Sequence, residues 1–312
     1  MRAVVVREYG PPESLVVEEV AEPEPIPTEV KVRVQVAGIN PVDVKTRQGG
    51  GTAPVLGEPP VRIGWDVAGI VSEVSGGVNR FRVGDEVFGM PWFPRQAGAY
   101  AEYVTAPSRQ FALKPSTLSF EEAGGLPLAG LTAWQVIVDT IGLSEGDELL
   151  IHGAAGGVGH LAVQVAKARG ANVIGTARME QAEWLHELGA TRVIDYRNQR
   201  FEELVSDLDA VIDFTGANGE GSLSVLRPGG ILVSVPSGVT PELVELAKRG
   251  ERRAAGFMVE PDPIGLEGLA TLVETGRLEV RVGQVFDLDQ AAEAHRLVES
   301  GKAEGKIVLR VP

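Results

Sequence analysis

An apolar stretch at residues 149–152 leads directly into a turn of small residues, Gly-Ala-Ala-Gly-Gly-Val-Gly at 153–159, where a helical pattern begins. This order matches the dinucleotide fingerprint, in which one small residue permits a tight turn, the next admits a pyrophosphate and the last lets the helix pack on the strand. Ala154, Gly156 and Gly159 hold these positions, with Ala in place of the first Gly. The N-terminus of the helix would then present N–H groups to the pyrophosphate. The expected cofactor-binding loop, named the phosphate loop below, comprises Ala154, Ala155, Gly156, Gly157, Val158 and Gly159.

Strand-like and helical segments alternate from residue 121 onward. Apolar residues such as Leu161, Val165 and Ala168 recur at helical spacing between the strands. Continuous apolar strands separated by helices indicate a parallel sheet covered on both faces, the doubly wound α/β architecture of Rossmann domains. This context favours a ligand-binding loop over a glycine-rich turn without a ligand. The six expected strands are at residues 148–152, 172–176, 192–195, 209–214, 230–235 and 254–259.

The first 115 or so residues have a different pattern, with short β-branched segments such as 30–36 and 67–74 between turn signals. This spacing indicates a small, irregular β-barrel. Two helical patterns follow Pro263, and we expect the strand-like segment at 306–311 to return to the barrel domain. The expected domains are the barrel at 1–120, completed by 262–312, and the dinucleotide-binding domain at 121–261.

The end of the second expected strand indicates which dinucleotide the loop binds. An NAD site places a carboxylate about 20 residues beyond the fingerprint, where it accepts a hydrogen bond from the ribose 2′-OH. Ala177 stands at this position, eighteen residues after Gly159, and Arg178 follows it. A guanidinium can hold a 2′-phosphate, and the missing carboxylate removes a repulsion. We therefore expect NADP(H), with Thr176 and Arg178 in its site; an ordinary surface Arg at a helix start is the alternative.

Three further strand ends are expected to line the cofactor, because ligands of such sheets lie beyond the carboxyl ends of the strands. Tyr196 follows the third strand, where it would pack at the adenosine end or at the edge of the core. Thr215 and Gly216 follow the fourth strand, and Ser234 and Val235 end the fifth. For Thr215, Gly216, Ser234 and Val235, a role in turn formation explains the residue type at that position equally well.

The composition excludes several classes of function. The 312 residues include no Cys, so disulfides, thiolate zinc sites and a Cys nucleophile are excluded. The four His residues are far apart, so we expect no protein-built metal centre. The net charge of −14 disfavours nucleic-acid and anionic-membrane partners. No apolar run reaches the roughly 18 residues of a membrane span, and the N-terminus turns polar too soon for a signal peptide, so a cytoplasmic protein is expected.

Several short motifs occur in a fixed order along the chain. They are Gly-Ile-Asn-Pro-Val-Asp at 38–43, Gly-Trp-Asp-Val-Ala-Gly at 64–69, Val-Gly-Asp-Glu-Val-Phe-Gly at 83–89, Gly-Ala-Tyr-Ala-Glu-Tyr at 98–103, Leu-Pro-Leu-Ala-Gly-Leu-Thr-Ala-Trp at 126–134, the phosphate loop, and Gly-Lys-Ile-Val-Leu at 305–309. In this order they resemble the medium-chain dehydrogenase/reductase superfamily. More narrowly, the chain resembles its zinc-free quinone oxidoreductases, which are related to zeta-crystallin, over essentially its whole length.

The resemblance implies a GroES-like β-barrel catalytic domain, a Rossmann domain and a catalytic cleft between them. In zinc-dependent relatives a Cys ligand lies near Asn40 and a His-Glu pair near Trp65 and Asp66, and this chain has neither. The implied activity is NADPH-dependent reduction of quinones or of α,β-unsaturated carbonyls by direct, metal-free hydride transfer. Charge that develops on the acceptor oxygen then needs a hydrogen-bond donor.

The resemblance also implies a set of catalytic residues. Asn40 and Lys45 are the candidate donors; relatives often carry Tyr at the position of Lys45, which could equally be a solvated Lys on a helix face. Asp43 is expected to orient or pair with nearby groups. Thr132 is expected near the nicotinamide, with a helix-surface position as the alternative. Lys306, in the last motif, is expected to bind the cofactor.

Other readings remain open for the function and for the aromatic residues. A pathway-specific enoyl or alkenal reductase is one alternative, and a non-catalytic NADPH-binding protein is another. Trp65 and residues 91–94 could form an apolar wall for the substrate, or a dimer contact. The resemblance favours a homodimer.

Overall fold

The computed structural model describes residues 1–236 and 238–312, and it divides into two compact units. Unit 1 comprises Met1–Leu131 and Glu260–Pro312, and unit 2 comprises Thr132–Val259. The first boundary falls inside helix α4 (Pro127–Trp134), whereas the sequence pattern placed it after residue 120. Helix α4 continues into a π-helical segment at Gln135–Ile141 that the sequence pattern did not predict.

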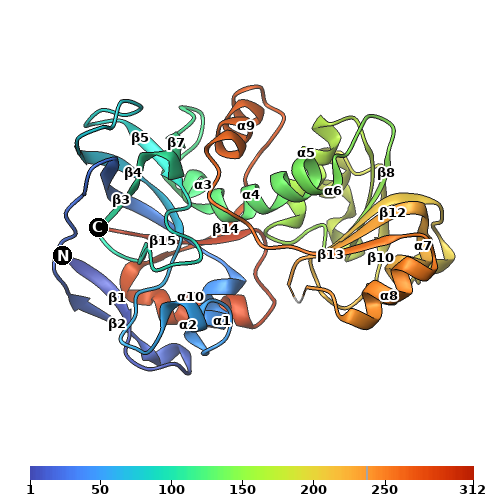
Figure 1. Cartoon of the computed structure of the whole chain (residues 1–312), viewed down its shortest axis with the longest axis horizontal. Helices are drawn as coiled ribbons and strands as arrows, with labels where there is room; N and C mark the ends of the chain where they lie inside the picture. The colour runs from blue at the N-terminus through green and yellow to red at the C-terminus, as the bar shows by residue number, and fades with distance from the viewer. Residues whose placement is uncertain (237) are drawn as a thin grey trace. The chain divides into compact units, whose positions relative to one another are not determined.

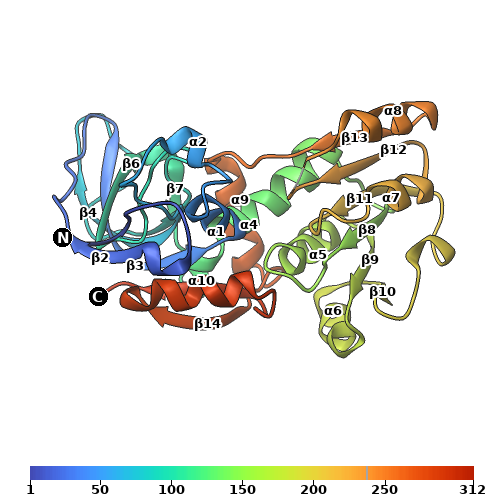
Figure 2. The same ribbon diagram turned by 90° about the horizontal axis from the view of Figure 1, so that it is seen from below.

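Unit 2 contains a six-stranded parallel sheet (Figure 1). Its strands, all labelled in Figure 2, run in the order β10-β9-β8-β11-β12-β13. The first strand in the chain, β8, lies in the middle, and later strands add outward on one side and then on the other. Its central residues, such as Leu150, are fully buried because helices cover both faces of the sheet. This arrangement confirms the predicted doubly wound α/β fold. The strands are β8 (Glu148–His152), β9 (Asn172–Ala177), β10 (Arg192–Asp195), β11 (Leu208–Asp213), β12 (Leu226–Ser234) and β13 (Arg253–Gly256).

Four helices cover this sheet. Helices α5 (Gly159–Ala168) and α6 (Ala182–Leu188) contact strands β8 to β10. Helices α7 (Gly219–Val225) and α8 (Pro241–Arg249) contact strands β11 to β13 and lie on the opposite face (Figure 2). Leu223 of α7 and Ala247 of α8 belong to a buried apolar cluster with Val211 of β11.

Unit 1 contains a seven-stranded sheet in which β3 (Glu29–Ile39) pairs antiparallel with β4, β6 and β15. The pairing of β15 (Lys306–Arg310) with β3 brings the last strand of the chain into this sheet. Strand β14 (Val282–Asp287) was not expected, because only Phe286 among its residues is buried and its apolar pattern is weak. The sheet is completed by β4 (Asp66–Val74), β5 (Glu86–Gly89), β6 (Tyr103–Pro107) and β7 (Phe111–Leu113). Strands β1 (Arg2–Val6) and β2 (Leu15–Glu19) form a separate two-stranded sheet.

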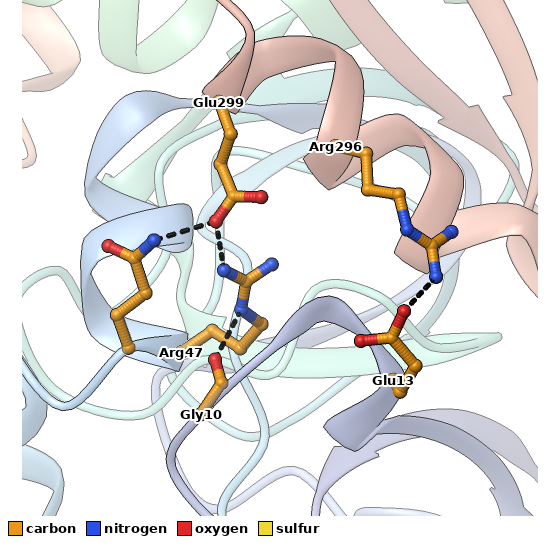
Figure 3. A network of polar contacts seen from close by, with 6 residues as sticks. Gly10, Glu13, Arg47, Arg296 and Glu299 are labelled. Carbon is orange, nitrogen blue, oxygen red and sulfur yellow. Dashed lines mark hydrogen bonds and ion pairs between the residues drawn. The ribbon is translucent and has the colours of Figure 1, made fainter.

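Helix α1 (Pro41–Arg47) directly follows β3 and packs against α10 (Ala291–Glu299). The buried Arg47 at the end of α1 pairs with Glu299 of α10, and its Nε donates to the carbonyl oxygen of Gly10 at 3.1 Å (Figure 3). Arg296 of α10 pairs with Glu13 at the surface. The contacts of Arg47 hold α1 against α10. The remaining α-helices of unit 1 are α2 (Ala53–Leu56), α3 (Phe120–Gly125) and α9 (Pro263–Glu274).

Across the described ranges, no helix combines the length and the hydropathy that crossing a bilayer requires.

Candidate active site

The small-residue turn of unit 2 joins the end of β8 to the start of α5. Gly153 has a φ of +75°, which a glycine adopts without strain. Gly159 is buried, and a Cβ added there would lie 2.1 Å from the carbonyl oxygen of Gly153. Gly156, in contrast, is exposed at the tip of the turn. Bare backbone therefore reaches the surface at the N-terminus of α5, and this arrangement fits the pyrophosphate of a dinucleotide.

Two polar side chains support this loop from behind. Oγ1 of Thr176 accepts the N–H of Gly153 at 3.3 Å and contacts Nδ1 of His152 at the same distance. The other ring nitrogen of His152 lies 3.2 Å from Oγ of Ser222. Burial lowers the pKa of His152 to about 4, so the ring is neutral at physiological pH. Thr176 thus supports the loop from a buried position, and His152 is a supporting residue that the sequence analysis missed.

Arg178 and Tyr196 follow the carboxyl ends of two neighbouring strands, β9 and β10. Arg178 follows the last residue of β9, and the N–H of Tyr196 donates to the carbonyl oxygen of that residue, Ala177, at 3.3 Å. Tyr196 is 58% exposed, and Arg178 is partly buried with its Nε 3.4 Å from Gln181. The nearby carboxylate of Asp195 is occupied by its own turn, where it accepts from Arg197 and Asn198. The guanidinium of Arg178 thus lies directly after the carboxyl end of β9 and is not paired with the carboxylate of Asp195 in these contacts.

The loop after β11 is organised by Asp213, which the sequence analysis left without a role. Oδ1 of Asp213 accepts the N–H groups of Thr215 and Gly216 at 2.8 and 3.0 Å. Burial opposes the charged form, but these hydrogen bonds outweigh it and lower the pKa of Asp213. Thr215 and Gly216 are held at an exposed turn, whereas Ser234, at the end of β12, is buried and Val235 is partly buried.

A cavity of about 480 Å³ opens beside the loop that follows β11. It lies between the short 3₁₀-helix η5 (Phe201–Glu203) and helices α7 and α8. Glu202 and Glu242 form part of its wall, so the cavity is unsuited to an anionic phosphate group. This charge distribution favours the N-terminus of α5 as the phosphate position in unit 2.

The candidate catalytic residues of unit 1 gather where β3 ends and α1 begins. Asn40 immediately precedes α1 and is 1% exposed. Its backbone N–H donates to Oδ2 of Asp43 at 2.6 Å, and Asp43 is the third residue of the helix. This is the capping arrangement that Asp favours in the first turn of a helix. Asp43 therefore orients Asn40 through the backbone.

The side chain of Asn40 is held by two residues that are distant in sequence. Its Nδ2 donates to Oδ2 of Asp66 at 2.8 Å, and its Oδ1 accepts from Nζ of Lys306. Lys306 is 3% exposed and lies 3.7 Å from Asp66, so the three side chains form one buried cluster. Oδ1 of Asp66 also accepts the N–H of Leu128, at the start of α4. Asp66 belongs to the motif at 64–69, and its proximity to Asn40 was not predicted from the sequence.

The other two candidate catalytic residues, Lys45 and Thr132, lie on helices, Lys45 at an exposed position and Thr132 at a buried one. Lys45 lies on the exposed face of α1, one turn after Asn40. Thr132 is buried in α4 and is the first residue of unit 2. Lys306 belongs to unit 1 and contacts Asn40, whereas the phosphate loop belongs to unit 2.

Trp65 does not form a substrate wall. Its side chain is 0% exposed, its Nε1 donates to the carbonyl oxygen of Arg95 at 2.6 Å, and its ring meets Phe93 edge-on at 5.4 Å. Trp65 and Phe93 are therefore core residues of unit 1. The hypothesis of an apolar substrate wall is wrong for Trp65, because the turn at residues 91–95 covers it, and for Phe93, because its ring packs on Trp65 in the core.

Asp43 should make the stability of the protein depend on pH. Burial raises the pKa of its carboxyl group from 3.8 to about 7, so the folded state binds this proton more tightly than the unfolded state does. The associated stability is fully present below pH 3.8 and is lost as the pH rises through about 7. Asp43→Asn keeps an acceptor for Asn40 and should remove this dependence, which amounts to at most about 1.4 kcal/mol per pH unit.

Urea denaturation of both proteins across this pH range measures the effect. The wild type should lose stability relative to Asp43→Asn as the pH rises. Parallel pH profiles for the two proteins would contradict the prediction.

Two family models match the chain. A model described as an alcohol dehydrogenase GroES-like domain matches residues 26–116, and one described as zinc-binding dehydrogenase matches residues 188–309. No group of three or more potential metal-ligating side chains occurs in the part of the chain that the structure describes.

Individual proteins match over nearly the whole chain. The 2-methylene-furan-3-one reductase of Solanum lycopersicum is 36% identical over 99% of this chain and 79% of its own length. The quinone oxidoreductase structure from Coxiella burnetii is 38% identical and has a TM-score of 0.94, covering 100% of this chain and 99% of that one. The chain belongs to the quinone oxidoreductase-like family of medium-chain dehydrogenases/reductases. The family predicted from the motifs is thus confirmed.

A third member of this family gives information on the cofactor. The quinone oxidoreductase of Escherichia coli, solved in complex with NADPH, is 28% identical with a TM-score of 0.87, covering 99% of this chain and 100% of that one. The GroES-like unit and the parallel-sheet unit of the present chain belong to the fold that these family members share.

Proposed function

We propose that this protein is an NADPH-dependent reductase of quinones or α,β-unsaturated carbonyl compounds that works by direct hydride transfer. The observation that carries the proposal is the end of β9, where Arg178 stands and no carboxylate occurs at Ala177. An NAD-specific site needs a carboxylate there, whereas a guanidinium suits a 2′-phosphate. The family members named above, two quinone oxidoreductases and an enone reductase, support the same class of acceptor.

In this proposal unit 2 binds the cofactor and supplies its orientation. NADPH, when bound, supplies the hydride. The bare backbone at Gly156 and the N-terminus of α5 hold the pyrophosphate, and Arg178 pairs with the 2′-phosphate. Tyr196 packs at the adenosine end, where it is exposed beside Arg178. The remaining wall residues are Thr215, Gly216, Ser234 and Val235.

Unit 1 supplies the groups that act on the acceptor. The amide of Asn40 can donate a second Nδ2 hydrogen besides the one given to Asp66, and we assign that hydrogen to the acceptor oxygen. The exposed Lys45 is the candidate proton donor. Thr132 is proposed to lie near the nicotinamide. Lys306 is proposed to bind the cofactor. Within unit 1 it contacts Asn40 and Asp66.

Turnover with a panel of acceptors tests the function. NADPH consumption is measured with a simple benzoquinone and with short-chain enones, under equal conditions. Consumption with both classes supports the proposal, and consumption with enones alone indicates a pathway-specific enoyl or alkenal reductase. NADPH binding without consumption across the panel indicates a non-catalytic binding protein and overturns the proposal.

The Arg178→Ala variant should lose preference for NADPH. Removal of one charge-assisted phosphate contact should cost about 1.5–3 kcal/mol, or roughly 10- to 150-fold in KM for NADPH, while KM for NADH stays nearly unchanged. Steady-state kinetics with both cofactors measures this. An equal rise in both KM values would show that Arg178 does not contact the 2′-phosphate.

The proposal extends to assembly and location. We propose a cytoplasmic homodimer. Strand β13 supports the dimer because it is an edge strand of the six-stranded sheet, and such an edge can pair with a second copy. Light scattering on the purified protein measures the oligomeric state, and a monomer at all concentrations would contradict it.

A further inference from the structure

His160 lies in the first turn of α5, immediately after the phosphate loop. Its side chain is 0% exposed. Its Nδ1 lies 2.9 Å from the carbonyl oxygen of Gly156, and its backbone N–H donates to the same oxygen at 3.1 Å. A carbonyl oxygen only accepts hydrogen bonds, so Nδ1 carries the proton in this contact. One loop carbonyl thus receives two hydrogen bonds from one residue.

The imidazole is itself held in position. Its ring lies against Trp184 of α6, with 5.8 Å between ring centroids and 30° between ring planes. The carbonyl oxygen of His160 accepts from Nε2 of Gln164, one turn further along α5. The side chain therefore approaches Gly156 from a packed interior and not from solvent.

The second hydrogen bond has a consequence for the next amide group. In a trans peptide unit the C=O and N–H bonds point in opposite directions, and the unit is planar. The carbonyl of Gly156 and the N–H of Gly157 belong to one such unit. Because the carbonyl is directed inward along α5, the N–H of Gly157 is directed outward, beyond the N-terminus of the helix. That is the side on which an anion binds.

We propose that His160 is a positioning residue of the cofactor site, whose Nδ1–H locks the peptide between Gly156 and Gly157 so that the N–H of Gly157 faces the pyrophosphate. The inference rests on the proposed function and deepens it. Glycines on both sides of a peptide unit leave it free to rotate, so a loop of this composition gains from an added restraint. His160 provides that restraint without touching the cofactor.

Two substitutions separate the Nδ1 donor from the packing of the ring. The amide nitrogen of Asn can take the place of Nδ1, whereas Phe keeps an aromatic ring beside Trp184 and has no donor. We expect His160→Phe to weaken NADPH binding about tenfold, as for one misdirected charge-assisted hydrogen bond. His160→Asn should bind NADPH nearly as well as the wild type. For both variants kcat at saturating NADPH should stay close to the wild-type value, because only cofactor binding is affected.

His186 offers a matched control. Its Nδ1 also contacts a backbone carbonyl oxygen, that of Ala190 at 2.7 Å, but at the end of α6 and away from the phosphate loop. His186→Phe removes a bond of the same kind and should leave the Kd for NADPH unchanged. Equal affinity of His160→Phe and the wild type would overturn the inference. So would a stronger weakening by His160→Asn than by His160→Phe, which would show that ring packing matters and the donor does not.

A measurement without cofactor separates this inference from the proposed function. The ¹H–¹⁵N resonance of Gly157 should shift in ligand-free His160→Phe and remain near its wild-type position in His160→Asn and His186→Phe. An unchanged resonance in all three variants overturns the inference even if the protein binds NADPH. If the wild type binds no NADPH at all, the proposed function fails, and the resonance of Gly157 still decides whether His160 orients the loop.

Discussion

Replacement of Gly159 by Ala is expected to destabilise the protein and to abolish tight cofactor binding. The added Cβ would lie 2.1 Å from the carbonyl oxygen of Gly153 and 2.7 Å from that of Ala154. Both neighbours are backbone atoms, so the loop itself must move away from α5. Overpacking of this kind costs about 1–3 kcal/mol, and the displaced loop should bind NADPH at least tenfold more weakly, an estimate that corresponds to about 1.4 kcal/mol.

Two other glycines separate the effects on folding and on binding. At Gly156 the added Cβ would lie 3.2 Å from the oxygen of Gly153, at an exposed position, so Gly156→Ala should reduce NADPH affinity with little loss of stability. At Gly76 no atom lies within 4 Å of the added Cβ, and Gly76→Ala should change neither property. Urea denaturation and NADPH titration of the three variants measure this order. Wild-type affinity and stability in Gly159→Ala would refute the close packing of α5 on the loop.

The Lys306→Met variant should lose about 3–5 kcal/mol of stability, because it leaves the carboxyl group of Asp66 buried without its cationic partner. Burial raises the pKa of Asp66 and lowers the pKa of Lys306, and the attraction between the two groups opposes both shifts. The hydrogen bonds that Asp66 accepts from Asn40 and Leu128 remain in the variant. The free energy of unfolding, measured by urea denaturation, gives the loss.

The double variant Lys306→Met/Asp66→Asn removes both charges of the pair and should recover much of the stability lost by Lys306→Met alone. Lys302→Met, at an exposed Lys near the end of the chain, is the matched control and should have little effect. Additive losses from Lys306→Met and Asp66→Asn would contradict the pairing of the two side chains.

The parallel-sheet unit could be predicted from sequence because its signals are local. Short apolar runs, such as those at 149–151 and 231–233, mark the strands, and the turn at 153–159 marks the phosphate loop. Strand β14 escaped prediction because only one of its residues is buried, and its position depends on pairing with β15. Trp65 was misinterpreted because its neighbours in sequence do not reveal that residues 91–95 cover it.

The supporting residues of the site carry weaker signals. His152 and His160 flank the loop in sequence, and a polar side chain at the end of an apolar strand or in the first turn of a helix could have indicated their roles. Their partners, Ser222 and Trp184, are far away in the chain and could not have been assigned.

The sequence by itself determined the strand–loop–helix unit, the absence of cysteine and the choice of Arg178 over a carboxylate, because each depends on residue type within a short segment. Only the tertiary structure decided that Lys306 contacts Asn40 across 266 residues and that Asp66 joins them. Pairing of β15 with β3, and of β4 with the other edge of β3, brings these three side chains into one buried cluster. Strand pairing between such distant segments depends on the packing of the whole unit, which short-range patterns do not encode.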